Sequence, residues 1–574
     1  MLPFLNSTRR VSADPFASVK ATTAWLRELP PRDALGRQQI ALQAFDGMLQ
    51  SRRPIDLARA QALQHADRAL STDRRALFRQ YVASMASAAG VSTRLWQASF
   101  DLTQAFASAY QAVLEAAVGP KAYGTWKPQV PILFARLIHY QATDTKLRVC
   151  RHERWIPAKW RELHRLYLRA SELGVSRIPT SLEATNPDAR QWTVEQEYIY
   201  VMLLHQLDSG NLTPAQYDEV AALVRTCSRK LKLTALPNAA EDFYVDVGGE
   251  RGLARRSGQE SGALLRYVDT TPLAAQLDLT IAALRKSDRS DTASIGAATR
   301  ERIRILQNAC DTVAPVPNSH LRRDPREACS IPARLRMGLA RIHQLCKGQN
   351  TTGSDASLGR VVEVRSNDRK ARTRRQGTDA PDTLCATLAM VDHTIWQVKD
   401  RSVSGLRIFT QGEAGQALIV GALVAVRQSD VSKWRLGAVR RINRLPSGEI
   451  EAGVSLIAEH FDAITLHAKR HVEQDSGVAV GGAEPPSGQR IEGLYLPPPS
   501  RPHKPILAKT VIVPTHEYAE GREVILTTPN SIYTVAMRQL VEQRGEWSWI
   551  AIKVVDKQPR PEAANEPTVE PPGV

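Results

Sequence analysis

The spacing of hydrophobic residues divides the chain into two parts. Up to residue 345, apolar side chains recur three or four positions apart, which is the period of an amphipathic helix. The clearest run covers residues 92–118, and Gly119-Pro120 ends it. Residues 1–345 are therefore predicted to be mostly α-helical, with further helices at 36–50, 55–70, 74–89, 132–145, 158–173, 193–207, 214–230, 272–286, 297–313 and 331–346.

A short pair of β-strands is expected inside this helical region. Residues 243–248 and 264–269 are rich in β-branched and aromatic side chains, and the loop between them is rich in glycine, arginine and serine. The loop lacks the G-x-x-x-x-G-K-[ST] pattern of a phosphate-binding P-loop. Residues 1–345 carry no motif that assigns them a family or an activity.

The pattern changes after Cys346. Residues 346–360 are rich in glycine, serine and threonine and are expected to form a linker. Six short antiparallel strands can close into a barrel, which removes the exposed edges of a sheet. Residues 361–470 are therefore predicted to form a six-stranded antiparallel β-barrel, with strands at 384–391, 394–399, 406–410, 417–427, 433–443 and 449–457.

The remainder of the chain predicts a second, smaller β module. Residues 471–503 form a Gly- and then Pro-rich linker, and the tail at 558–574 is rich in proline and glutamate and is expected to be disordered. The predicted fold class is thus multidomain α + β, in which a large helical region precedes the barrel and the small β module. The module covers residues 504–557, with strands at 508–513, 522–527, 532–538 and 547–555.

Composition indicates the compartment and the kind of partner. The 574 residues carry a formal net charge of +17, which favours anionic partners such as a nucleotide, a nucleic acid or a membrane surface. The six cysteines are scattered without the spacing of a zinc site or of a disulfide framework. The first residues lack a long apolar stretch after their charges and no apolar run approaches the length of a membrane span, so we expect neither a signal peptide nor a transmembrane segment. We expect a cytoplasmic protein without a metal site or a transmembrane segment.

Known catalytic and nucleic-acid-binding motifs are missing from the sequence. It contains no G-x-S-x-G, H-E-x-x-H, Walker or Rossmann motif, so we predict no enzyme activity, no catalytic residues and no cofactor. It also lacks a helix-turn-helix, a zinc finger and an aromatic-basic RNA-binding signature. Specific binding of nucleic acid is therefore not expected.

Candidate binding chemistry begins with a dense basic block at residues 365–375. Arg365 and Arg369 form an R-x-x-x-R in this block. A guanidinium matches a phosphate or the O6/N7 edge of guanine bidentately, and it can stack on a purine. The register within the block stays open, because other basic residues lie beside this pair. The same spacing recurs on segments mostly expected to be helical, where it produces only a solvated face, at Arg161/Arg165, Arg251/Arg255, Arg300/Arg304 and Arg322/Arg326.

A second motif, D-x-S-x-x-G, is formed by Asp400, Ser402 and Gly405 between two predicted strands. The Asp400 carboxylate is able to accept hydrogen bonds from N1 and N2 of a guanine, and Ser402 adds a small hydroxyl. Gly405 suits a tight turn, or the close approach of a ligand to the backbone. The alternative is an ordinary hairpin turn made of Asp, Ser and Gly.

Together, and in this order, the two motifs resemble the signature of the PilZ family, the bacterial receptors for cyclic di-GMP, over residues 360–470. The resemblance implies a small β-barrel and a nucleotide-binding protein of signal transduction. It implies that the arginines hold phosphates and guanine faces, that the Asp and Ser hold guanine edges, and that the ligand-binding residues are Arg365, Arg369, Asp400, Ser402 and Gly405.

The function that follows is that of a bacterial cyclic di-GMP effector without catalysis of its own. Cyclic di-GMP would be its ligand, and binding would signal to the helical region and so to a protein partner that the sequence does not identify. The alternative is a PilZ-like adaptor that binds proteins and no nucleotide.

Overall fold

The computed structural model describes residues 14–559 outside the segments 85–88, 120–122, 183–190, 209, 238–241, 259, 288–295, 316–323, 350–393, 413–414, 416, 469–488, 499, 501–505 and 529–530. The predicted strand at 384–391 and the basic block at 365–375 thus lie outside the described residues. The chain divides into two compact units. Unit 1 comprises residues 1–323 together with 441–451, and unit 2 comprises residues 324–440 and 452–574.

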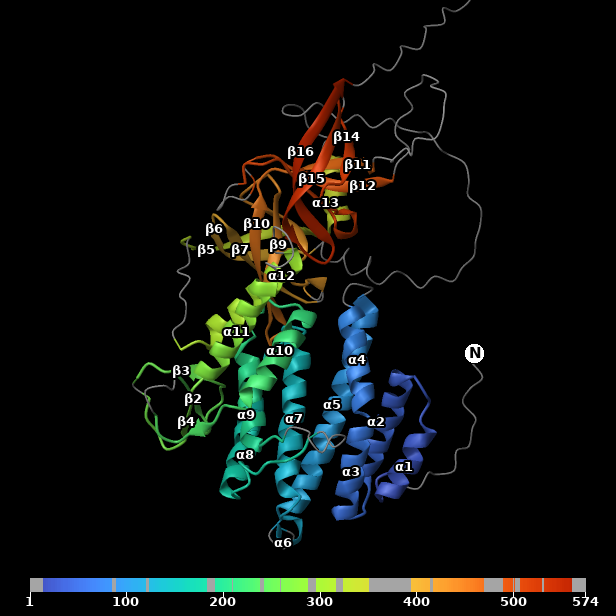
Figure 1. Ribbon diagram of the computed structural model, residues 1–574, viewed down its shortest axis with the longest axis vertical. Helices are drawn as coiled ribbons and strands as arrows, with labels where there is room; N and C mark the ends of the chain where they lie inside the picture. Colours follow the sequence, from blue (N-terminus) through green and yellow to red (C-terminus); the bar gives the residue numbers. More distant parts are fainter. Residues whose placement is uncertain are drawn as a thin grey trace, which may run out of the picture. The chain divides into compact units, whose positions relative to one another are not determined.

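Unit 1 is mainly α-helical, as the sequence predicts. Its helices are α1 (Val19–Glu28), α2 (Ala34–Gln50), α3 (Leu57–Ala69), α4 (Ser71–Ser84), α5 (Ala89–Ala117), α6 (Tyr123–Trp126), α7 (Val130–Val149), α8 (Pro157–Glu172), α9 (Val194–Gln206), α10 (Pro214–Ser228), α11 (Thr271–Ser287) and α12 (Ala297–Val313). The long helices α5, α7 and α9 run side by side (Figure 1). Capping boxes start α9 and α10: Thr193 pairs with Gln196, and Thr213 pairs with Gln216.

A small sheet is inserted between α10 and α11. It contains β1 (Leu233–Thr234), β2 (Phe243–Asp246), β3 (Ala254–Arg255) and β4 (Leu265–Val268), in the order β1-β4-β2-β3. Strands β2 and β4 pair antiparallel. The predicted strand pair inside the helical region is therefore confirmed.

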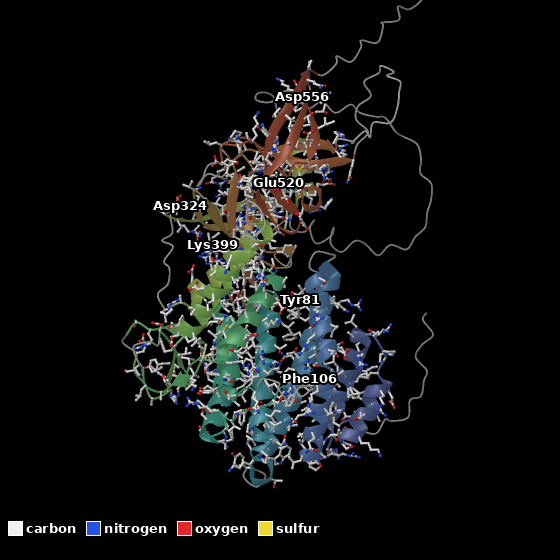
Figure 2. The ribbon with its side chains drawn as sticks, viewed as in Figure 1. Tyr81, Phe106, Asp324, Lys399, Glu520 and Asp556 are labelled. Carbon is white, nitrogen blue, oxygen red and sulfur yellow. The ribbon has the colours of Figure 1, made fainter. Side chains whose placement is uncertain are left out.

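The core of unit 1 is rich in aromatic side chains. Phe106, labelled in Figure 2, stacks on Tyr140 with ring centroids 5.2 Å apart and meets the edge of Phe45 at 4.6 Å. Asp67 is fully buried in the same core, where it accepts hydrogen bonds from the hydroxyls of Tyr110 and Tyr140. A buried carboxylate requires such partners, because burial removes its hydration.

Residues 441–451, which comprise the ends of two consecutive strands and the turn between them, belong to unit 1. The backbone N–H of Ile442 donates to Gly210 O at 2.9 Å, and that of Arg444 donates to His152 O at 2.8 Å. Both acceptor residues have positive φ, +68° for Gly210 and +60° for His152. A side chain at Gly210 would place its Cβ on Ile442 O, so only glycine fits there.

Unit 2 contains two closed β-barrels. The first consists of β5 (Glu327–Met337), β6 (Trp396–Ser402), β7 (Gly405–Gln411), β8 (Leu423–Gln428), β9 (Arg435–Arg444) and β10 (Glu449–Ala458). The second consists of β11 (Asp462–Ala468), β12 (Arg490–Leu496), β13 (Thr510–Pro514), β14 (Glu523–Thr527), β15 (Ser531–Gln543) and β16 (Trp547–Pro559). The predicted fold class, a helical region followed by a six-stranded barrel and a further β module, is confirmed.

The two barrels share one topology. Neighbours around the first are β5-β6-β7-β10-β9-β8, and around the second they are β11-β12-β13-β16-β15-β14. Counted from its own first strand, each barrel therefore has the cyclic order 1-2-3-6-5-4. The further β module is a second copy of the same fold, although its sequence alone predicts only four of the six strands.

The barrels of unit 2 share a core with α13 (Leu339–Gln349). Ile342 of α13, Trp434 of the first barrel and Trp549 of the second belong to one buried cluster. Trp547, another member of this cluster, donates from Nε1 to Gly421 O at 2.9 Å, and Arg440 forms an ion pair with Glu542. The two barrels are therefore packed together, and the predicted linker at 471–503 is not a connection between them, because residues 490–496 form β12 of the second barrel.

One predicted element is wrong, and it changes the first barrel. The helix expected at 331–346 is instead the end of β5 followed by α13. In β5 the buried residues alternate, at Ala333, Leu335 and Met337, with arginines between them, which is the period of a strand. Residues ahead of 346 thus supply the first strand of a barrel that the sequence pattern places at 361–470. Within the described part of the chain, no helix combines the length and hydrophobicity that a membrane crossing requires.

Candidate functional site

The D-x-S-x-x-G motif lies on a tight hairpin of the first barrel. Ser402 pairs with Gly405 at the ends of β6 and β7, so Val403 and Ser404 form a two-residue turn. The Ser402 hydroxyl contacts Gly405 O at 3.4 Å. Asp400 follows a register shift in β6 and pairs with Arg407 of β7. The structure therefore brings Asp400, Ser402 and Gly405 together, as the sequence predicts.

Gly405 is required by the packing of the barrel. A Cβ at this position would lie 2.8 Å from Val454 O of β10, and no positive φ is involved. The neighbouring Ser404 carbonyl accepts a hydrogen bond from Leu456 N of β10 at 2.9 Å. The group that approaches Gly405 closely is thus the backbone of β10, and the expected approach of a ligand at this residue stays a prediction.

Two arginines surround the Asp400 carboxylate. Arg326 Nη1 lies 2.5 Å from Asp400 Oδ1, and Arg407 Nη1 lies 3.6 Å from Asp400 Oδ2. Arg326 directly precedes β5, and β5 pairs with β6 so that Ala328 is opposite Asp400. The strand pairing itself therefore carries this arginine to the D-x-S-x-x-G hairpin.

A second ion-pair group involves Arg401, the residue after Asp400. Arg401 Nε donates to Glu327 Oε2 at 3.0 Å, and its Nη1 donates to Asp430 Oδ2 at 2.6 Å. Hydrogen bonds to these two carboxylates raise the pKa of Arg401 above its ordinary value. Arg401 is therefore held in place by charges on both sides.

An open cavity of about 440 Å³ lies against this hairpin, and it belongs entirely to unit 2. Figure 2 labels Asp324, just ahead of β5, and Lys399 on β6, which mark the two strands beside it. A cavity of this size is in the range that holds a small organic ligand. Its lining comes from the start of β5, the β6–β7 turn and the start of β9: Pro325, Arg326, Glu327, Arg401, Ser402, Val403 and Arg435.

The charge around the cavity favours an anion. Three guanidinium groups and one carboxylate line the cavity, Arg326, Arg401 and Arg435 against Glu327. The other charged groups nearby lie beside the cavity rather than in its lining: Asp400, Asp430, Arg407 and Glu459. Guanidinium groups recognise phosphate and guanine edges by paired hydrogen bonds. Ser402 and the exposed Val403 add a hydroxyl and an apolar surface at the rim.

The predicted R-x-x-x-R pair, Arg365 and Arg369, lies outside the described residues. The arginine at the hairpin is Arg326, from the pair Arg322/Arg326, which is one of the recurrences of the R-x-x-x-R spacing to which the sequence pattern assigns no binding role. Arg322 also lies outside the described residues. The signal that identifies Arg326 is its position directly before a strand, but the incorrect helix at 331–346 hides that strand.

Other kinds of site find no support in the described ranges. Among the residues placed there, no three His, Cys, Asp or Glu side chains come together as a metal site. The second barrel has no equivalent of the tight hairpin, because β12 ends at Leu496 and β13 begins at Thr510. The candidate site is therefore confined to the first barrel.

Comparison with known proteins adds information on the other unit. Residues 20–239 match the family model described as "Cyclic-di-GMP receptor FimW, N-terminal domain". The matched segment covers α1 to β1 and lies within unit 1. No curated protein matches the chain. The similarity thus concerns the helical region, for which the sequence motifs alone indicate no family.

Proposed function

We propose that this protein is a bacterial cyclic di-GMP receptor that binds the dinucleotide in the cavity of its first barrel and has no catalysis of its own. Two independent features support this. The helical unit resembles the N-terminal domain of a cyclic di-GMP receptor. The first barrel places Arg326 and the D-x-S-x-x-G motif at one cavity, although the arginines that the resemblance to PilZ domains implies are Arg365 and Arg369.

The observation that carries the proposal is the ion pair of Arg326 with Asp400 beside the cavity. Cyclic di-GMP presents two anionic phosphodiesters and two guanines. Arg326 is suited to a phosphate or a guanine face, and Asp400 is suited to the N1 and N2 donors of a guanine. A bound ligand would thus exchange the Arg326–Asp400 pair for contacts of each partner with the nucleotide.

Arg365 and Arg369 stay in the proposal as additional ligand contacts. They occupy the long connection between α13 and β6, and β6 carries Asp400. Replacing Arg326 by Ala, and separately Arg365 and Arg369 together by Ala, compares the two assignments. If Arg322 and Arg326, and not Arg365 and Arg369, are the arginine pair that holds the ligand, the single change weakens binding and the double change does not.

Signalling to the helical region would use the ribbon of β9 and β10. Arg435 at the start of β9 lines the cavity, and Val454 of β10 lies against Gly405 of the motif. The turn of the same ribbon, at 441–451, belongs to unit 1, where Ile442 and Arg444 bond to the backbone. A ligand changes this arrangement only as far as it binds one state better than another.

Equilibrium dialysis against labelled cyclic di-GMP tests the assignment of the site. Hydrogen bonds to charged groups contribute about 1.5–3 kcal/mol, so Arg326→Ala and Asp400→Ala should each weaken binding by about 10- to 100-fold. Arg538→Ala, on the exposed part of β15, removes the same charge as Arg326→Ala and should leave binding unchanged. Equal affinity of all three variants and the wild type would show that the ligand binds elsewhere.

A folded protein that binds no cyclic di-GMP would favour the adaptor function. One feature is consistent with that alternative, because Asp400 is already neutralised by Arg326 and Arg407. In that case the same two variants would leave the fold intact and change only the surface that a protein partner contacts.

A further inference from the structure

Arg435 differs from the other arginines of the cavity in how its charge is compensated. It is the first residue of β9, where it pairs with Val426 of β8, and its side chain is half-buried at the cavity wall. It belongs neither to the R-x-x-x-R nor to the D-x-S-x-x-G motif. The barrel therefore places a third guanidinium beside the cavity without any signature in the sequence.

The other two arginines of the cavity wall are already engaged. Arg326 is paired with Asp400 at 2.5 Å. Arg401 bridges Glu327 and Asp430, at 3.0 and 2.6 Å. A ligand that recruits either of these guanidinium groups must first break an existing ion pair, and that cost reduces the net affinity gained.

Arg435 carries no such cost. Its Nη2 is shielded from solvent and has no hydrogen-bond partner among the residues that the structure describes. Its guanidinium also forms no ion pair with any carboxylate of the described residues. A buried donor without an acceptor is unfavourable, so an acceptor supplied by a ligand would stabilise the complex without displacing a protein group.

The electrostatic surroundings of Arg435 are consistent with this. Burial lowers its pKa; Glu459 and Asp430 act to raise the pKa, and Arg401 acts to lower it. The guanidinium keeps its proton in proteins, so Glu459 and Asp430 offset the cost of its burial only in part. A ligand anion between Arg435 and Arg401 would relieve both the burial and the repulsion between the two arginines.

We propose that Arg435 binds a phosphate of the ligand and supplies a large part of the affinity of the cavity. This inference rests on the proposed function, because it names cyclic di-GMP as the source of the phosphate. A phosphodiester oxygen is the acceptor that a guanidinium fork fits best among the groups of the dinucleotide. Arg326 and Asp400 then contact the guanine, whereas Arg435 holds the phosphate.

Binding and stability measured on the same full-length variants test this. Arg435→Ala should weaken cyclic di-GMP binding by about 10- to 100-fold, the effect of losing a hydrogen bond to a charged group. Without ligand, the same variant should melt at an unchanged or higher temperature, because it removes a buried donor that has no partner. An arginine with only a structural role would give the opposite pair of results, a lower melting temperature and unchanged affinity.

Two further variants complete the design. Arg435→Lys keeps the charge but loses the planar fork, so it should restore only part of the affinity. Arg538→Ala removes an exposed arginine of the same unit and controls for the loss of one positive charge. The salt dependence of binding should become shallower for Arg435→Ala and stay unchanged for Arg538→Ala, because only the former removes a charge at the ligand.

The outcomes separate this inference from the proposed function. If the wild type binds cyclic di-GMP, Arg326→Ala weakens binding and Arg435→Ala does not, the assignment of Arg435 is wrong and the receptor function stands. If the folded wild type binds no cyclic di-GMP, both proposals fall together. A lower melting temperature of Arg435→Ala with unchanged affinity would identify a structural arginine.

Discussion

Asp67 provides the sharpest test of how unit 1 is held together. Its side chain has no exposed surface and accepts from four groups: Arg74 at 2.7 Å, Arg136 at 3.1 Å, Tyr110 at 2.8 Å and Tyr140 at 2.6 Å. These partners come from α4, α7 and α5, whereas Asp67 lies on α3. One carboxylate thus connects four helices.

The cost of Asp67→Ala follows from these contacts. The change leaves two guanidinium groups and two hydroxyls in the core without their acceptor. Each buried donor without a partner costs about 1–3 kcal/mol, and breaking a buried ion pair typically costs about 3–5 kcal/mol in total after relaxation. We expect Asp67→Ala to lower the free energy of unfolding of unit 1 by about 3–5 kcal/mol.

Urea unfolding followed by far-UV circular dichroism measures this, because the helical signal comes mainly from unit 1. Tyr140→Phe removes one donor and keeps both ion pairs, so it should cost about 1 kcal/mol. Asp73→Ala is the control, since it breaks the more exposed Arg37–Asp73 pair and should cost less than about 1 kcal/mol. If Asp67→Ala cost no more than Asp73→Ala, the reasoning from burial would be refuted.

The pH dependence of stability offers a second measurement on the same residue. Burial alone would raise the pKa of Asp67, but Arg136, Arg74 and the two tyrosine hydroxyls outweigh it and hold the pKa well below its ordinary value. A carboxylate with a lowered pKa stabilises the fold above its unfolded pKa of about 3.9 and loses that contribution as the pH falls further. Acid unfolding of Asp67→Ala should therefore depend less steeply on pH than that of the wild type.

Two further predictions concern unit 2. Gly405→Ala would place a methyl group 2.8 Å from Val454 O, so it should lower the free energy of unfolding of unit 2 by about 1–3 kcal/mol and also weaken ligand binding. Calorimetric unfolding and dialysis check this, and Gly545→Ala is the control, because Gly545 is exposed, lies in the same unit and has open space around its Cβ position. Glu542 is nearly buried, which acts to raise its pKa, but Arg440 and Arg544 lower that pKa to about 2. Its contribution should be full above about pH 4.3 and lost between there and pH 2, a dependence that Glu542→Gln should flatten in thermal melts at a series of pH values.

The helical region and the existence of a barrel follow from the sequence, because both rest on local periodicity. Residues 92–118 repeat large apolar side chains at helical spacing and form α5 (Ala89–Ala117). The motif Asp400-x-Ser402-x-x-Gly405 likewise lies on the predicted hairpin. These features need no knowledge of distant residues.

The parts that the sequence does not predict depend on long-range pairing. Strand β5 merges with α13 into one apparent helix, because alternation over five residues is too short to outweigh the helical pattern that follows. Strands β11 and β12 close the second barrel across the segment 469–488, which no local pattern indicates. Arg326 reaches the cavity through the pairing of β5 with β6, and Arg435 through the pairing of β8 with β9. The motif therefore predicts Asp400, Ser402 and Gly405 of the candidate site, whereas the two arginines become apparent only from the strand pairing.

Isothermal titration calorimetry of the full-length protein with cyclic di-GMP at near-physiological salt, with GTP as the control nucleotide, tests the central claim most directly. The account predicts saturable binding of cyclic di-GMP at micromolar or lower concentration and no comparable heat with GTP. Absence of cyclic di-GMP binding by folded protein, established also by dialysis, would contradict the receptor function.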